Sequence, residues 1–173
     1  MAPGGALTFD EFVRLKQVSL LRFGTVLTGD PRLGEEVVQA VLVRAYERWS
    51  EIGEMDYVSA YIRRMIVNDF LSWRRKFARI EPFDAFKHDR NVADHAENHA
   101  ERDAVLLELA KLPKRQRAVL VLRYYDDLSD TEIAEVLGCS AGTVRGYASR
   151  ALSTLRIAAP PTQSSSMAEG VTT

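Results

Sequence analysis

Residues 129–150 read SDTEIAEVLGCSAGTVRGYASR, and this stretch decides the fold of the C-terminal part of the chain. It predicts two short helices separated at Gly138, with Ser129 and Ser140 placed to cap them by accepting from first-turn N–H groups. Apolar side chains share one face of each helix: Ile133, Ala134 and Leu137 on the first, and Val144, Ala148, Ala151 and Leu155 on the second. Such a pair is a helix-turn-helix, which would present Thr143 and Arg145 to a DNA major groove. The alternative is a helical hairpin that binds no DNA.

The composition fits a folded protein whose nucleic-acid surface, if it has one, is local. The chain has 173 residues, 46% of them hydrophobic, and a formal net charge of −1. The one cysteine, Cys139, excludes an intramolecular disulfide and a thiolate metal cluster; we expect a small apolar side chain there, with redox sensing as the alternative. The chain shows neither a signal-peptide pattern nor a membrane-spanning apolar run, so we expect a cytoplasmic protein without membrane insertion.

Hydrophobic spacing predicts three helices in the N-terminal half, over about residues 9–28, 32–49 and 57–78. The first follows a capping residue, Thr8, and stops at Thr28-Gly29-Asp30-Pro31. The residues expected to face inward are Phe9, Phe12, Val13, Leu20, Phe23 and Leu27 in the first helix, Val38, Val41, Leu42, Ala45 and Trp49 in the second, and Val58, Tyr61, Ile62, Met65, Ile66, Phe70, Trp73 and Phe77 in the third.

We therefore predict an all-α fold of two small helical domains joined by a flexible linker. Residues 1–8 form a disordered N-terminus, 9–79 the first domain, 80–96 an acidic linker, 97–157 the second domain and 158–173 a polar disordered tail. In the second domain, a helix over about 97–111 is followed by one starting near Pro113 and by the helix-turn-helix.

Charge follows these boundaries. Residues 80–104 carry seven Asp and Glu against three Lys and Arg, whereas both flanking domains are slightly basic. Acid in the linker would repel DNA and could shield a basic face in the free protein, a hypothesis drawn from charge alone. The three histidines, His88, His95 and His99, lie in or beside this linker, but no carboxylate or thiol set completes a metal site, so we expect no metal and no cofactor.

A basic stripe on the third helix predicts a second nucleic-acid contact. Residues 63–79 hold six Lys and Arg against one Asp. Arginines neutralise phosphates, and an asparagine offers a donor and an acceptor to one base edge. The alternative is a solvated basic face with Trp73 and Phe77 in the core. The stripe consists of Arg64, Asn68, Ser72, Arg75 and Arg79, flanked by Arg63, Arg74 and Lys76.

The second helix has a mixed polar side that fits either a protein-docking surface or an ordinary exposed face. Its outward residues include Glu35, Glu36, Gln39, Arg44 and Glu47, and we expect Val37 and Val43 to be exposed among them.

These segments together resemble a bacterial RNA polymerase sigma factor of the extracytoplasmic-function type, over about residues 9–157. Residues 35–46 (EEVVQAVLVRAY) resemble the polymerase-binding helix, and residues 61–76 (YIRRMIVNDFLSWRRK) the segment that melts and reads the minus-ten promoter element. Residues 112–145 resemble the minus-thirty-five domain. The NDFLSWRR wording is closest to a SigE-like group common in actinobacteria.

The resemblance implies roles by position. Gln39 corresponds to a residue that meets the clamp helices of the polymerase largest subunit, although Ala40 stands where Glu or Asp is usual. Asn68 corresponds to an asparagine near the flipped minus-ten base. Gly146 and Tyr147 replace a frequent Ser-Arg pair, which implies a different promoter preference. The implied contacts are Glu35, Glu36, Val38, Gln39 and Arg44 for the polymerase; Arg64, Asn68, Arg74, Arg75, Lys76 and Arg79 for the minus-ten element; and Ser140, Thr143, Arg145, Tyr147, Ser149 and Arg150 for the minus-thirty-five element.

The resemblance implies core RNA polymerase and promoter DNA as partners, an anti-sigma factor as a possible third, and a monomer when free. Two other readings stay open on the residues: a stand-alone helix-turn-helix regulator, and a degenerate relative that only sequesters a partner. An enzyme is not expected, because no nucleophile–base pair, phosphate loop or metal set is present.

Overall fold

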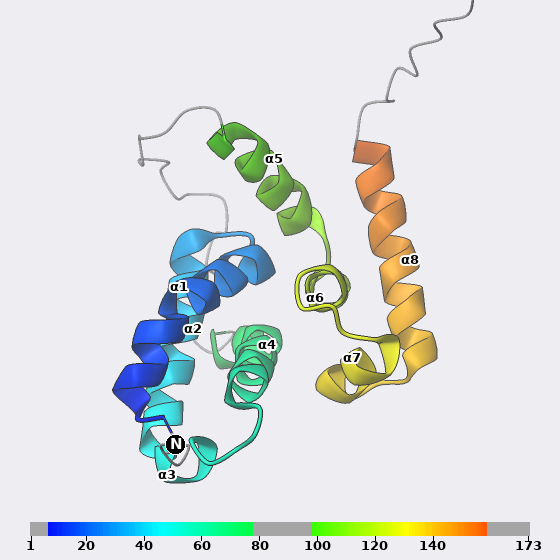
Figure 1. Cartoon of the computed structure of the whole chain (residues 1–173). Helices are drawn as coiled ribbons and strands as arrows, with labels where there is room; N and C mark the ends of the chain where they lie inside the picture. The colour runs from blue at the N-terminus through cyan, green and yellow to red at the C-terminus, as the bar shows by residue number, and fades with distance from the viewer. Residues whose placement is uncertain (1–6, 78–97, 159–173) are drawn as a thin grey trace, which may run out of the picture.

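A computed structural model describes the backbone of residues 7–77 and 98–158, and the side chains of residues 7–72 and 102–156. All regular structure in these residues is helical, as predicted (Figure 1). The helices are α1 (Phe9–Thr28), α2 (Pro31–Glu47), α3 (Trp49–Ile52), α4 (Val58–Phe77), α5 (Asn98–Lys111), α6 (Lys114–Tyr124), α7 (Asp130–Leu137) and α8 (Ala141–Ala158). The linker assigned to residues 80–96, the tail and both His88 and His95 lie outside the described residues.

The first helix begins and ends where its capping residues predict. Thr8 and Glu11 form a capping box, in which the Thr8 hydroxyl accepts from the Glu11 N–H and the Glu11 carboxylate accepts from the Thr8 N–H. Gly29 ends the helix with a φ of 76°, a left-handed conformation that glycine adopts without steric cost. α2 follows at once, capped by Asp30. The short connection lays α2 back along α1.

α1 and α2 approach so closely that two glycines are required at the contact. A Cβ on Gly24 would lie 2.8 Å from the Gly34 carbonyl oxygen, and a Cβ on Gly34 would lie 2.6 Å from the Thr25 backbone nitrogen. α4 packs against both helices and closes a core that includes Phe12, Phe23 and Phe70. This core fixes the outward faces of α2 and α4.

The second helix differs from the prediction in two respects. It ends at Glu47 rather than residue 49, and Trp49 belongs to the one-turn helix α3, where its ring meets Phe9 and Phe12 edge-on or tilted at centroid distances of 5.2 and 5.1 Å. The expectation that Val37 is exposed was wrong, because Val37 precedes Val41 by one turn and shares its buried face. Val43 is exposed, as predicted.

α6 is the central helix of the C-terminal half, with α5, α7 and α8 around it (Figure 1). Residues Ala118–Leu122 of α6 are all buried, since neighbours cover every side of the helix. α8 packs on α6 and α7 through Val144, Ala148 and Ala151, which were predicted to face inward.

The two halves of the chain also pack against each other. Arg117 of α6 is buried, and its guanidinium donates to the carbonyl oxygens of Leu27 and Thr28 at the end of α1. The same group donates to the carbonyls of Ala110 and Leu112, at 2.8 and 3.1 Å, where α5 ends. One arginine thus satisfies the carbonyls that two helix ends leave without intrahelical donors.

Candidate nucleic-acid interface

The helix-turn-helix is built by the capping residues that the sequence singled out. Ser129 and Glu132 form a capping box at the start of α7, and the two hydrogen bonds from Ser129 lower the pKa of the Glu132 carboxyl. Gly138 ends α7 with a φ of 63°. The Ser140 hydroxyl then accepts from the Thr143 N–H at 3.1 Å and starts α8. The predicted caps and turn are therefore confirmed.

The N-terminal half of α8 presents its polar side chains outward. Arg145 is 67% exposed and lies 4.0 Å from the Asp130 carboxylate. The Arg150 guanidinium stacks over the half-buried ring of Tyr147, with 5.3 Å between its central carbon and the ring centroid. Ser140, Ser149 and Arg150 are exposed and Thr143 is half-buried. The six residues predicted for one DNA contact thus lie on the cap and the first three turns of α8, beside α7.

A shallow groove of about 600 Å³ runs between the start of α7 and α8. Two arginines that sequence reasoning did not select, Arg123 and Arg156, line it together with Arg145 and Ser149. The signal for Arg156 was its spacing, because Arg145, Ser149 and Arg156 recur at helical intervals on one side of α8. Arg123 gave no such signal, since it belongs to α6 and reaches the groove by pairing with Asp130.

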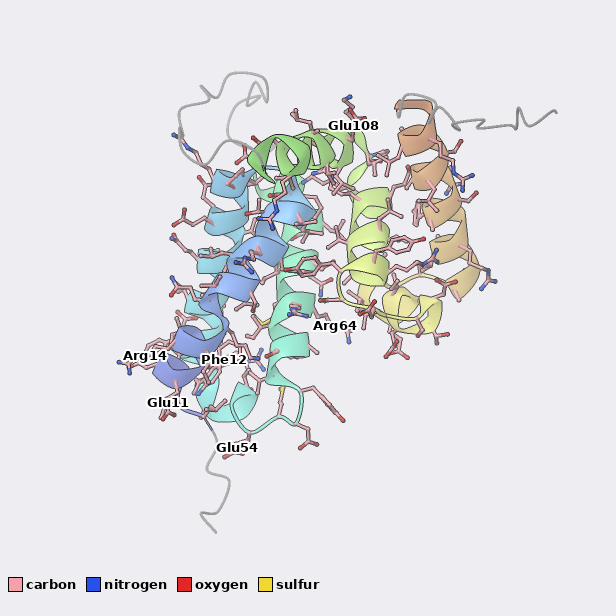
Figure 2. All side chains as sticks on the ribbon, turned by 45° about the horizontal axis from the view of Figure 1, so that its top comes forward. Glu11, Phe12, Arg14, Glu54, Arg64 and Glu108 are labelled. Carbon is pink, nitrogen blue, oxygen red and sulfur yellow. The ribbon has the colours of Figure 1, made fainter. Side chains whose placement is uncertain are left out.

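The basic stripe on α4 has a different environment from the one predicted. Asn68 is exposed, and so is Arg64, which Figure 2 labels on α4. The Arg64 side chain donates to the backbone carbonyl of Glu135 in α7 at 3.2 Å. Its neighbour Arg63 forms an ion pair with Asp126. Arg74, Arg75 and Lys76 belong to the last turns of α4, but their side chains, like the whole of Arg79, lie outside the described residues.

Asp126 is the acidic residue most affected by this packing. Burial raises the pKa of its carboxyl, and the neighbouring Asp127 adds to the rise, whereas Arg63 opposes it. The Asp126 side chain is only 7% exposed. Its environment thus penalises the ionised form in spite of the ion pair.

Three of the five α2 residues predicted to contact the polymerase are exposed, and two are not. Glu35, Glu36 and Gln39 are exposed, and the Gln39 amide donates to the Glu35 carboxylate at 2.9 Å. Val38, which was predicted to contact the polymerase, is 1% exposed and packs over Gly24, so its side chain belongs to the contact between α1 and α2.

Arg44, the remaining residue assigned to the α2 face, is half-buried and pairs with Asp69 of α4 at 2.8 Å. Asp69 is a residue that sequence reasoning did not select. Its isolation among six cations in residues 63–79 was the available signal.

Two negative findings apply to the described residues alone. No group of three or more His, Cys, Asp and Glu side chains there is arranged to hold a metal ion. None of the helices within 7–77 and 98–158 combines the length and hydropathy needed to cross a bilayer. The histidines weighed as ligands, His88, His95 and His99, have no described side chains.

Comparison with known proteins gives concordant results. Residues 102–155 match the family model "Sigma-70, region 4". The chain is 40% identical to an RNA polymerase sigma-E factor of Streptomyces avermitilis over 157 residues, covering 90% of this chain and 87% of that protein. It is 37% identical to the sigma-E factor of Streptomyces coelicolor, covering 88% and 86% of the two chains.

A solved structure shares the fold. It is the sigma factor RpoE in complex with the anti-sigma factor NepR from Bartonella quintana, with a TM-score of 0.68, 23% identity and coverage of 86% of this chain and 94% of that one.

Proposed function

Because the chain belongs to the RNA polymerase sigma factors of the extracytoplasmic-function type, in a SigE-like group, we propose how its surfaces divide the work of promoter-directed initiation. α8 reads the minus-thirty-five duplex, α4 reads and melts the minus-ten element, and α2 docks on the core polymerase. A stand-alone regulator is not favoured, since the chain matches the sigma-E factors named above over most of their length.

The observation that carries the proposal for α8 is the exposed Arg145 on the first turns of a capped helix. The N-terminal turns of such a helix enter the major groove, where an arginine can bond a guanine edge through two parallel hydrogen bonds. Tyr147 and Arg150 extend this edge as a stacked pair, and Ser140, Thr143 and Ser149 supply hydroxyls for phosphates or bases. Arg123 and Arg156 add positive charge along the same groove.

For α4 we propose that Asn68 contacts an extruded base of the non-template strand and that Arg64, Arg74, Arg75, Lys76 and Arg79 contact promoter phosphates. Extruding a base costs a few kcal/mol of stacking, which such contacts offset. The nucleotide chemistry belongs to the polymerase, and we assign no catalytic residue to this chain.

For α2 we propose that Glu35, Glu36 and Gln39 contact the polymerase, with Val38 and Arg44 holding the helix in the required position. Val38 acts through its packing on Gly24, and Arg44 through its ion pair with Asp69. We also propose that residues 9–79 and 97–157 act as two domains, that the free protein is a monomer acting in the cytoplasm, and that an anti-sigma factor binds it, as one binds the solved relative.

Transcription by purified core polymerase on a randomised promoter library tests the function. With this protein added, we expect transcripts enriched for two motifs upstream of their start sites. Absence of enrichment, together with duplex binding by the protein alone, would reject the sigma mechanism and favour the stand-alone regulator.

A further inference from the structure

One acidic side chain, Asp130, lies in the groove between α7 and α8 among the described residues that line it. The other charged residues there are all arginines: Arg123, Arg145 and Arg156. A carboxylate repels the phosphates that arginines attract, so it weakens a surface that binds DNA by charge alone. The position of Asp130 therefore needs an explanation other than affinity for the DNA backbone.

Both carboxylate oxygens of Asp130 face arginines. The Oδ1 atom accepts from the Arg123 guanidinium, in an ion pair whose side chains are 24% exposed for Arg123 and 27% exposed for Asp130. The Oδ2 atom lies 4.0 Å from Nη1 of Arg145. One oxygen thus ties the carboxylate to α6, and the other is turned toward the arginine on α8.

The carboxylate has a fixed position, whereas Arg145 has a mobile side chain that extends into solvent. Asp130 is the first residue of α7 and directly follows Ser129, whose capping box with Glu132 fixes the backbone there. Arg145 is 67% exposed, and an arginine on the surface has many rotamers. An ion pair with a fixed partner restricts the directions in which the Arg145 guanidinium points.

Such a restriction affects base recognition and phosphate contact differently. Two parallel hydrogen bonds to a guanine edge require one orientation of the guanidinium plane, whereas attraction to a phosphate tolerates many. The carboxylate also repels phosphates from the groove. Both effects disfavour binding to unmatched sequences, and specificity is the difference between the affinities for matched and unmatched DNA.

We propose that Asp130 is a positioning residue for recognition of the minus-thirty-five duplex: Arg123 fixes its carboxylate, and the carboxylate orients the Arg145 guanidinium toward base edges. The inference rests on the proposed role of α8 in reading that duplex. Because Arg145 is exposed, its ion pair with Asp130 contributes little to the free energy of unfolding. The contribution of Asp130 appears in the discrimination between DNA sequences.

Asp130→Asn tests this role, since the amide keeps the shape of the side chain and removes its charge. Full-length wild-type protein first selects duplexes from a pool of randomised double-stranded DNA. Fluorescence anisotropy then gives the affinities of each variant for a selected duplex and for a scrambled duplex of the same composition. Asp127→Asn is the matched control, because Asp127 is exposed and is not among the residues that line the groove. Thermal unfolding confirms that each variant is folded.

We expect Asp130→Asn to bind the scrambled duplex at least as tightly as the wild type does. The ratio of the affinities for the selected and scrambled duplexes should fall by about fivefold or more, the lower end of what one base-reading contact contributes. Asp127→Asn should leave this ratio unchanged. A purely structural role of Asp130 at the start of α7 would instead weaken binding to both duplexes together.

Coupling to Arg145 separates positioning from a general effect of charge. In an Arg145→Ala background, Asp130→Asn should leave the affinity ratio unchanged, because the side chain through which Asp130 acts is absent. In an Arg150→Ala background, Asp130→Asn should keep its full effect, since the Arg150 guanidinium stacks on Tyr147.

An unchanged ratio in Asp130→Asn would overturn the proposal. An equal fall in Asp127→Asn, or a fall that persists without Arg145, would overturn it as well. If the wild type selected no motif from the pool, both this inference and the reading of the duplex by α8 would fail. The sigma function is judged separately, by transcription from the promoter library with core polymerase. A wild type that passes both tests while Asp130→Asn keeps its ratio would therefore reject the positioning role alone.

Discussion

At the scale of single residues, Arg145 is the exposed side chain that we propose distinguishes promoters. We expect Arg145→Ala to weaken binding to the preferred minus-thirty-five duplex by about 1–3 kcal/mol, because a base-edge contact is lost in addition to a charge. Fluorescence anisotropy on the preferred and on a scrambled duplex would measure both losses.

Arg102→Ala is the matched control for this change, since Arg102 is exposed on α5 and carries the same charge away from the groove. It should weaken both duplexes slightly and equally. If Arg145→Ala also weakened both duplexes equally, Arg145 would be a phosphate contact and the preference would lie elsewhere on α8.

Asp126 gives a pH dependence whose sign follows from its environment. Burial raises the pKa of its carboxyl above the ordinary value of about 4. The Asp126 carboxyl therefore contributes favourably to the free energy of unfolding when it is protonated. This contribution is fully present below a pH of about 4 and is lost as the pH rises through the raised pKa. We expect the melting temperature of the wild type, relative to Asp126→Asn, to fall across this interval. A difference that grew with pH would show instead that the ionised pair with Arg63 dominates.

At the scale of elements, the turn between α7 and α8 depends on the backbone of one glycine. Gly138 has a φ of 63°, yet nothing lies within 4 Å of where its Cβ would be. Gly138→Ala should therefore cost only the backbone strain, about 1 kcal/mol. Urea unfolding would measure the loss.

Gly142→Ala, four residues later, should have the opposite sign. Gly142 is the second residue of α8, and its added Cβ would come no closer than 3.7 Å to a neighbour, the Ser140 hydroxyl oxygen. Alanine in a helix interior is favoured over glycine by about 1 kcal/mol, and in this first turn we expect a smaller gain of the same sign. Destabilisation of equal size at both positions would mean that packing, rather than backbone conformation, governs this turn.

At the scale of the whole molecule, Arg117 connects parts of the chain that sequence reasoning treated as separate. Arg117→Met should destabilise the protein by about 2–4 kcal/mol, because buried carbonyls at the ends of α1 and α5 lose their donor. Chemical unfolding followed by circular dichroism would measure it, with Arg102→Met as an exposed control. A loss below about 0.5 kcal/mol, the usual range of surface changes, would contradict the bridging role of Arg117.

Local features of the fold were largely predictable from the sequence. Thr8 and Gly29 fixed the bounds of α1, and Ser129, Gly138 and Ser140 fixed the helix-turn-helix, because caps and turns are decided by a few neighbouring residues. It was harder to predict how many side chains of α2 belong to its buried face. Polar neighbours of Val37 indicated an outward position, whereas the valine belongs to the buried face of Val41.

The contacts between the halves could not have been predicted in the same way. Arg63 and its partner Asp126 are 63 residues apart along the chain, and no helical spacing connects them. On the sequence alone, Arg63 and Arg64 were simply members of a basic stripe. The packing of α4 against α7 shows that the Arg64 guanidinium has a hydrogen-bond acceptor within the protein, the Glu135 carbonyl.

The glycine contact between α1 and α2 has a consequence for inherited variation. The backbones of α1 and α2 are in contact at Gly24 and Gly34. Even the methyl group of alanine at either position would overlap main-chain atoms of the other helix. A methyl group there would push α2 away from α1 near the start of α2. The resulting tilt would displace the other end of α2, where Tyr46 and Glu47 lie. A saturation library should consequently show two intolerant positions ten residues apart in the sequence, with defects that appear in polymerase assembly before they appear in DNA binding.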